Sequence, residues 1–429
     1  MIKNKKILVL SIPAWNSKVG SDTWTTLVEG LDPDNIANIS LRDEIPDNPA
    51  CNHYFAISEN RVIKSIFKRK TKTGRVLTRA QKETSSSADL AAHNERYRKM
   101  SKKRGFFGLF AREAVWKLGK WKTRELDAFL EDFDPDIVLY AMEGYIHFNR
   151  LCRYVTKKTG AKSIGYFWDD NFTYKQTRRF GLKAFRFLQR RSLKKLAKQT
   201  DAFWAITDMT KKEADAFFKV DCTIVTKPLK KEAVYQDWQV NTPIQILYTG
   251  NLQIGRDKSL LKVVSALKEI NRENTFFCLD VYTKTQLSEE VQKQLSCDFC
   301  SLHAPVPQSE VLTLQERADI LLFLEDVDGP DAKTARLSFS TKITDYLSSG
   351  KCIFAVGCMD TAPMQYFLEN RAAMIANTHK DMVDRLESIL HSPEILKEYA
   401  KQACACGMKN HKKENILQTV RQTIEEVLS

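Results

Sequence analysis

Short apolar runs alternate with amphipathic stretches along most of the chain, and the alternation recurs in both halves. Mostly apolar runs, typical of buried strands, occur at 5–15, 137–141, 161–170, 200–207 and 222–228 in the first half and at 244–250, 275–283, 318–325 and 352–356 in the second. Between them, apolar residues recur every three or four positions, as at 147–159 and 258–270, which predicts helices. Strands that alternate with helices indicate a mostly parallel sheet, so we predict an α/β fold with one sheet in each half.

The chain of 429 residues is too long for one ordinary hydrophobic core, so we expect two domains. The pattern predicts an N-terminal α/β domain at 1–228, a linker at 229–243 and a C-terminal α/β domain at 244–429 that ends in helices. Residues 43–125 interrupt the first domain, because they are polar, basic and weakly periodic. We interpret them as a basic helical insertion.

The same pattern argues against a membrane span and against a metal site. The longest apolar runs are far shorter than a transmembrane helix requires. The start, MIKNKKILVLSIPAW, resembles a signal peptide, but its apolar run is short and we predict a first strand. Cys297 and Cys300 form a C-x-x-C, yet the other close pair, Cys404 and Cys406, lies far along the chain, so no metal is expected. Scattered core cysteines fit a reducing compartment, and we expect a cytoplasmic protein.

Positive charge is concentrated in two segments of the first half of the chain. The net charge is +14, but 61–125 carries 20 Lys/Arg against 5 Asp/Glu, and 175–199 carries 10 Lys/Arg and no acid. The remainder is therefore at 14 − 15 − 10 = −11. Localised positive charge suggests an anionic partner: a membrane surface, a polyanion or a phosphorylated substrate. The basic stretch 182–198 is either a domain helix with a solvated cationic side or a peripheral contact with anionic lipid.

Two predicted strand–loop–helix junctions in the second half carry polar groups. ARLSFSTKITDYLSSGKCIFAVG (335–357) offers Ser340 or Thr341 as a helix cap, followed by Lys342 and Asp345. YTGNLQIGRDKSLL (248–261) places Arg256 and Lys258 after two glycines. Caps and exposed helix residues explain each stretch alone, but two such junctions in one parallel sheet converge on one crevice.

These two stretches resemble the C-terminal domain of glycosyltransferase family 4-like enzymes, and DPDIVLY, SIGYFWDDN and TDAFWAIT are similar to the N-terminal domain of that family. The resemblance implies the GT-B fold, with two Rossmann-like domains, and transfer of a sugar from a nucleotide donor with retention of configuration. It implies that Arg256 and Lys258 hold the diphosphate and that Asp345, in place of the second Glu of the E-x7-E motif, binds the ribose. Leu337 stands where that motif has its first Glu.

The full set of expected donor-binding residues is Gly250, Asn251, Arg256, Lys258, Ser338, Ser340, Thr341, Lys342 and Asp345. Residues that follow strands of the first half are candidates for the acceptor side, namely Gly20, Glu143 and Asp169. The candidate catalytic residues are Asp170, His147 and Lys342. His147 is equally interpretable as a packed helix residue, and a front-face displacement needs no enzyme base, because the leaving phosphate can accept the acceptor's proton.

We therefore predict a retaining glycosyltransferase that moves a sugar from a nucleotide-sugar to a glycan or lipid-linked acceptor, in cell-surface polysaccharide synthesis. It would bind no cofactor tightly and act in the cytoplasm, with possible docking on the inner face of the membrane. Two alternatives stay open. The absent first Glu allows a GT-B binding protein that has lost catalysis, and the basic segments allow a nucleic-acid-binding protein. The second is disfavoured, because the sequence contains no recognised nucleic-acid motif.

Overall fold

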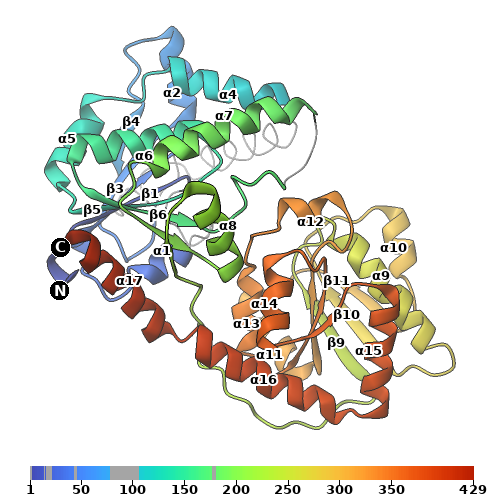
Figure 1. Cartoon of the computed structure of the whole chain (residues 1–429). Helices are drawn as coiled ribbons and strands as arrows, with labels where there is room; N and C mark the ends of the chain where they lie inside the picture. Colours follow the sequence, from blue (N-terminus) through green and yellow to red (C-terminus); the bar gives the residue numbers. More distant parts are fainter. Residues whose placement is uncertain (1, 14, 16–21, 43–45, 78–105, 176–179) are drawn as a thin grey trace. The chain divides into compact units, whose positions relative to one another are not determined.

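The computed structural model describes residues 2–13, 15, 22–42, 46–77, 106–175 and 180–429, and Figure 1 shows its helices and strands. These residues form two compact units. Unit 1 contains most of the chain up to Val225 together with Leu417–Ser429, and unit 2 contains Thr226–Ile416. Each unit has its own sheet, as the alternating pattern predicts. The assignment of the last residues differs from the expectation, because Leu417–Ser429 belong to unit 1.

The described part of unit 1 contains an eight-stranded sheet in the order β4-β3-β2-β1-β5-β6-β7-β8. Neighbouring strands are parallel, except for the antiparallel pair of β3 and β4. The strands are β1 (Ile7–Ser11), β2 (Ile36–Ser40), β3 (His53–Ile57), β4 (Gly74–Leu77), β5 (Ile137–Ala141), β6 (Lys162–Phe167), β7 (Ala202–Ala205) and β8 (Cys222–Ile224). The first strand is fully buried at the centre of this sheet, so the expectation of a core strand near the start is confirmed.

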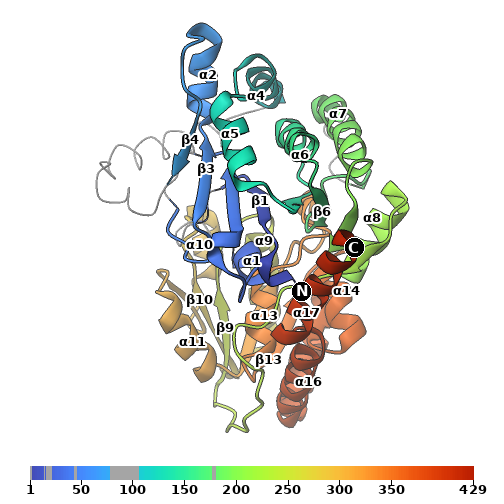
Figure 2. The same cartoon turned by 90° about the vertical axis from the view of Figure 1, so that its left-hand side faces the viewer.

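The helices of unit 1 follow the strands in sequence. They are α1 (Asp22–Leu27), α2 (Glu59–Phe67), α4 (Phe106–Leu118), α5 (Arg124–Phe133), α6 (Ile146–Thr159), α7 (Phe180–Ala197) and α8 (Asp208–Phe218), joined by the end of α17 (Lys413–Leu428). Helix α4 packs against α2, α6 and α7, and α5 packs against α6. Figure 2 shows α4, α5, α6 and α7 together on one side of the sheet.

The segment 43–125, predicted as a helical insertion, contains both strands and helices. Part of it is sheet, because β3 and β4 extend the edge beyond β2. The short run Tyr54–Ile57 is buried, but it stands among polar and basic residues that hide its apolar character in a longer window. Helices α2 and α4 agree with the helical part of the expectation. Residues 43–45 and 78–105 lie outside the described residues.

Unit 2 contains a six-stranded, fully parallel sheet in the order β11-β10-β9-β12-β13-β14. Its strands are β9 (Ile244–Thr249), β10 (Phe277–Tyr282), β11 (Cys300–His303), β12 (Ile320–Leu324), β13 (Cys352–Val356) and β14 (Met374–Ala376). Its helices are α9 (Arg256–Ile270), α10 (Glu289–Leu295), α11 (Gln308–Arg317), α12 (Pro330–Thr334), α13 (Thr341–Leu347), α14 (Ala362–Asn370), α15 (His379–His391) and α16 (Glu394–Asn410). Residues of the predicted linker at 229–243 lie against this unit, where the Trp238 indole donates to Asp319 Oδ1 at 3.0 Å.

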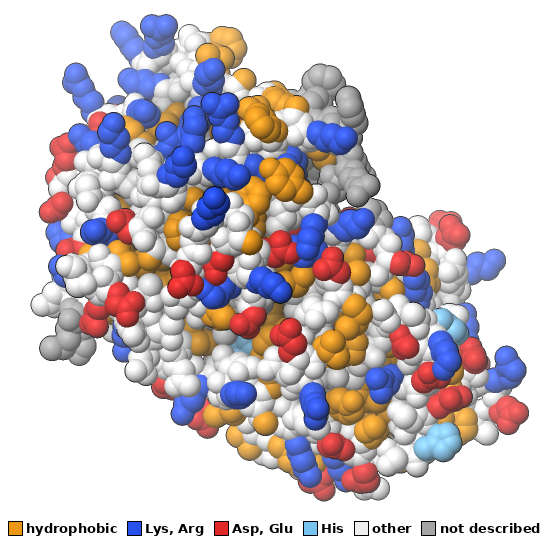
Figure 3. Space-filling view, in the orientation of Figure 1, with side chains coloured by type: hydrophobic (Ala, Val, Ile, Leu, Met, Phe, Trp, Pro, Cys, Tyr) orange, Lys and Arg blue, Asp and Glu red, His pale blue; other side chains and the backbone are white. Residues whose placement is uncertain are grey.

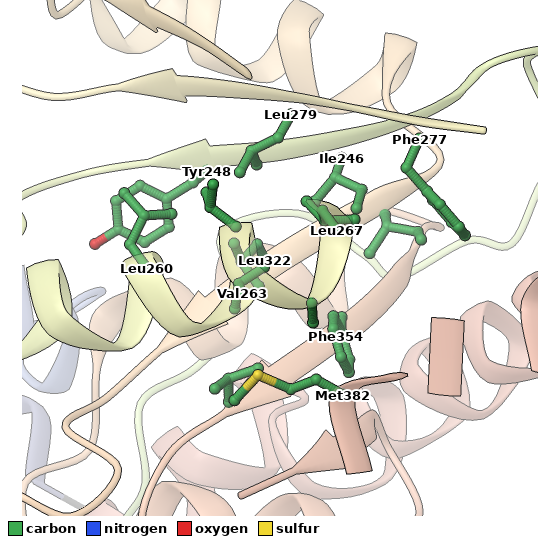
Figure 4. Packing of buried hydrophobic residues seen from close by; sticks show 14 of the residues in the cluster. Ile246, Tyr248, Leu260, Val263, Leu267, Phe277, Leu279, Leu322, Phe354 and Met382 are labelled. Carbon is green, nitrogen blue, oxygen red and sulfur yellow. The ribbon is translucent and has the colours of Figure 1, made fainter. Parts of the chain in front are cut away.

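The core of unit 2 follows from the two-residue period of its strands. Alternate positions such as Ile246, Leu279 and Phe354 face one side, where α9 and α15 cover them (Figure 4). Strands buried on both faces need apolar residues at nearly every position, which explains the continuous runs at β12 and β13. None of the helices in the described residues is both long and apolar enough to cross a membrane.

Candidate functional site

Two loops of unit 2 leave the carboxyl ends of adjacent strands. The loop at 250–255 joins β9 to α9, and the loop at 325–329 joins β12 to α12. Strands β9 and β12 are neighbours in the sheet, so both loops begin at the same edge. In a parallel sheet this edge is where ligands bind, because loops and helix starts there present backbone groups and side chains together.

The loop after β9 holds an unusual backbone. Gly250, Ile254 and Gly255 have positive φ angles of 142°, 60° and 74°. Glycine adopts such angles readily, whereas Ile254 is β-branched and strained there. A side chain at position 255 is also excluded by contact, because its Cβ would lie 2.4 Å from Asp326 Cγ. Strain of this kind persists where the surroundings impose it, commonly at ligand sites.

Asp326 fixes the second loop. Its carboxylate is buried and accepts hydrogen bonds from the backbone N–H groups of Gly329, Asp331 and Ala332 at 3.0 to 3.1 Å. These bonds satisfy the free donors at the start of α12. Asp326 therefore shapes the loop and is not available to a ligand.

Arg256 is held in place by three partners. Its guanidinium donates to both carboxylate oxygens of Glu325 at 3.0 Å, to the Leu324 carbonyl at 3.0 Å and to Asn251 Oδ1 at 3.2 Å. Burial raises the pKa of the Glu325 carboxyl, and Arg256 opposes that rise. The family resemblance implied that Arg256 holds the diphosphate, and this role stays a prediction; in the structure the guanidinium pairs with the Glu325 carboxylate.

Lys342 lies beside this pair with its charge uncompensated. Its ammonium is 4.4 Å from the centre of the Tyr248 ring, and a Cβ on Gly250 would lie 2.1 Å from Nζ. The Lys342 ammonium makes no hydrogen bond or ion pair with the side chains that the structure describes. The pKa of Lys342 is lowered to about 8, mainly because burial disfavours its charged form. Repulsion from Arg256 lowers the pKa further, and attraction to Glu325 raises it.

The remaining residues of the predicted donor set either have partners within unit 2 or are exposed. Ser340 caps α13 by accepting from Lys342 N at 3.4 Å, and Thr341 and Lys258 are exposed. The Asp345 carboxylate lies 3.7 Å from Lys230 Nζ, so it already has a cationic neighbour. Ser338 donates its backbone N–H to the Ala335 carbonyl at 2.9 Å.

Leu337, at the position of the motif's first Glu, is completely buried. The structure thus brings Gly250, Asn251, Arg256 and Lys342 together, while Asp345 pairs with a residue of the predicted linker.

In unit 1, Glu143 and Asp169 follow the adjacent strands β5 and β6. Burial raises the pKa of Glu143 to about 7, and the nearby Asp169 adds to the rise. The Trp168 side chain and the Gly144 N–H donate to the Glu143 carboxyl and oppose it. A Cβ at position 144 would lie 2.1 Å from Gln189 Nε2, so a larger residue there would require the Gln189 side chain to move. These two carboxyls remain the candidates for the acceptor side.

His147 and Asp170, the candidate catalytic residues of unit 1, are buried and have partners within the protein, and their catalytic roles stay predictions. The His147 ring is 2% exposed, stacks on Trp116 at 4.9 Å and pairs through Nδ1 with Glu113 Oε1 at 2.8 Å. It therefore packs α6 against α4, and its pKa is lowered mainly by burial. Asp170 is 4% exposed and accepts from the backbone N–H and the hydroxyl of Thr173. Gly20 lies outside the described residues.

No group of three or more His, Cys, Asp or Glu side chains is arranged to hold a metal ion among the described residues. All ten cysteines are free, including the pair Cys297 and Cys300. Sequence reasoning missed Tyr248 as the ring under Lys342 and Glu325 as the partner of Arg256. The position of Tyr248, second to last in β9, was a signal, because such residues lie near the loop edge.

Neither protein-family models nor curated proteins match the sequence. Several solved structures, however, have a similar fold. Sucrose-phosphate synthase from Thermosynechococcus elongatus superposes with a TM-score of 0.62 at 10% identity, covering 99% of each chain. Anabaena HepE in complex with UDP and glucose has a TM-score of 0.61 at 9% identity, covering 99% of this chain and 100% of that one.

A Burkholderia xenovorans α,α-trehalose-phosphate synthase (UDP-forming), in complex with glucose-6-phosphate, has a TM-score of 0.58 at 9% identity and covers 99% and 100%. At such identities the likeness establishes the fold, and the chain has the GT-B architecture. The resemblance to glycosyltransferase family 4 stays a prediction, because no family model matches.

Proposed function

We propose that the protein is a glycosyltransferase in which unit 2 binds a nucleotide-sugar through its diphosphate. The observation that carries the proposal is the Lys342 ammonium, half-buried against Gly250 and Tyr248 with no anionic partner among the described side chains. A partly desolvated cation is unfavourable without an anion, and the lowered pKa of Lys342 reflects this. A phosphate group bound there would remove the penalty.

The neighbouring ion pair of Arg256 and Glu325 leaves Lys342 as the charge that an anionic ligand would neutralise, because Glu325 already neutralises Arg256. Arg256 also orients Asn251 through a hydrogen bond. When the sugar leaves the donor, negative charge accumulates on the diphosphate. A fixed cation at that point stabilises the transition state more than the ground state, which lowers the barrier.

The finer parts of the proposal concern the sugar, the acceptor and the stereochemistry. Transfer with retention needs no base from the protein, since the leaving phosphate accepts the proton of the acceptor hydroxyl. Asp345 would bind the ribose after releasing Lys230, and Glu143 with Asp169 would contact a glycan or lipid-linked acceptor. The UDP and glucose bound to HepE make UDP-glucose the first donor to test.

The test begins with binding. Calorimetric titration with UDP, GDP and ADP measures affinity for each nucleotide, and consumption of UDP-glucose or GDP-mannose with added membrane extract measures transfer. The anomeric configuration of the product, read by NMR, tests retention. Absence of binding by every nucleoside diphosphate would overturn the proposal.

One observation favours a second function. Leu337 is fully buried where the family motif has a glutamate, so a donor-sugar contact is missing. A GT-B protein that binds nucleotide-sugars without turnover would explain this. Nucleotide binding together with intact UDP-glucose and GDP-mannose after long incubation with acceptor extract would favour this function.

A further inference from the structure

Helix α7 of unit 1 presents an outer face that its own domain does not use. Phe185, Leu193 and Leu196 face inward and are buried, and Phe185 contacts Phe110 of α4 at 5.5 Å between ring centres. The outward positions carry apolar residues in the first half of the helix, where Phe187 is 61% and Leu188 is 41% exposed. Figure 3 shows Lys and Arg side chains gathered among hydrophobic ones over this part of unit 1.

The second half of the outer face is cationic. Residues 180–198 contain seven Lys and Arg and no acid. Arg191, Lys194, Lys195 and Lys198 are exposed, and none forms an ion pair with an acid among the described residues. Arg191 and Lys195, like Lys194 and Lys198, are four positions apart, a spacing at which like charges repel in a helix. The folded chain thus leaves this repulsion unrelieved.

Two of the cations on α7 lie against aromatic rings. The Arg190 guanidinium lies 4.3 Å from the Tyr174 ring centre and donates to the carbonyls of Phe172 and Thr173. The Lys194 ammonium lies 4.5 Å from the Phe217 ring centre. Together with Tyr174 and Phe187, the cations from Arg190 to Lys198 line a shallow hollow of about 340 Å³. A hollow of this size with cationic walls suits a phosphate headgroup.

We propose that the outer face of α7 docks the protein on an anionic membrane surface. The cations would contact phosphate headgroups, and Phe187 and Leu188 would enter the interface between headgroups and acyl chains. A nucleic acid would also use the charge, but it would gain little from Leu188, because an aliphatic side chain offers no ring for a base to stack on. This docking surface is independent of the nucleotide site in unit 2.

The experiment is flotation of the full-length protein with vesicles of phosphatidylcholine alone and with added phosphatidylglycerol. The wild type is expected to float with the anionic vesicles and not with the neutral ones. Lys194→Glu/Lys195→Glu should lower the partition constant at least about thirtyfold, from roughly 1 kcal/mol per cation. Lys284→Glu/Lys293→Glu, on exposed lysines of unit 2, makes the same charge change and should leave binding unaltered.

Leu188→Ala separates lipid from nucleic acid. This variant keeps every charge and every aromatic ring, so we expect weaker flotation but unchanged binding to a labelled single-stranded oligonucleotide. Equal flotation with neutral and anionic vesicles, or no flotation at all, would overturn the proposal. So would oligonucleotide binding that depends on Lys194 and Lys195 while flotation does not. Circular dichroism melting of each variant ensures that a loss of binding is not a loss of fold.

Discussion

Replacing Lys342 with methionine should stabilise the free protein and weaken nucleotide binding at once. The pKa of Lys342 falls from 10.5 to about 8 in the folded chain. At about 1.4 kcal/mol per pKa unit this shift corresponds to roughly 3 kcal/mol against the charged form. The side chain is only half-buried and water screens it, so we expect about 1–2 kcal/mol of added stability in Lys342→Met.

The assay is thermal melting with and without a nucleoside diphosphate. For a domain the size of unit 2, 1–2 kcal/mol raises the Tm by about 3–6 °C. Loss of a charge-assisted hydrogen bond to phosphate should weaken nucleotide affinity about ten- to a hundredfold. Lys333→Met, on an exposed lysine of the same unit, is the matched control and should change neither quantity.

The pH dependence gives a second check on Lys342. Between about pH 8 and 10.5 the folded lysine has lost its proton, whereas the unfolded chain still binds one. The free energy of unfolding therefore rises with pH in this window, and the rise should be absent in Lys342→Met. If Lys342→Met melted below the wild type and kept full nucleotide affinity, Lys342 would be paired within the protein and would not contact the nucleotide.

Three further substitutions test the surroundings of both candidate sites. Arg256→Met should leave the buried Glu325 carboxylate unpaired and lower the free energy of unfolding by about 3–5 kcal/mol, measured in urea. Adding Glu325→Gln should recover most of this loss. A double variant as unstable as the single one would contradict the role of the ion pair. Gly250→Ala should cost about 1–3 kcal/mol and weaken nucleotide binding, because φ is positive and the new Cβ meets Lys342, and wild-type melting would argue against it. In the wild type, the free energy of unfolding should fall between about pH 4.5 and 7, because the Glu143 carboxyl ionises in the unfolded chain before it ionises in the folded one. Glu143→Gln should abolish this fall. If the free energy of unfolding depended on pH in the same way in both proteins, the pKa of Glu143 would not be raised.

The α/β architecture was predictable because its signal is local. Continuous apolar runs such as those of β12 and β13 are required wherever a parallel strand is covered on both faces, and they are legible in any window of a few residues. Strand β3 was missed because its short buried run lies among polar and basic residues. Its place in the sheet depends on pairing with β2, which no local pattern records.

The candidate site divides in the same way. The apolar pattern alone indicates that Gly250 and Arg256 follow a strand and that Lys342 lies near the start of a helix, because the positions of strands and helices along the chain are local features. Which of the charged groups are paired depends on the tertiary structure: Glu325 neutralises Arg256, Lys230 lies beside Asp345, and Lys342 has no ion-pair partner among the described residues. His147 shows the same limit, since its burial against Trp116 depends on a helix some thirty positions away in sequence. The physical reason is that desolvation and ion pairing act through space, between side chains whose separation along the chain carries no trace of their contact.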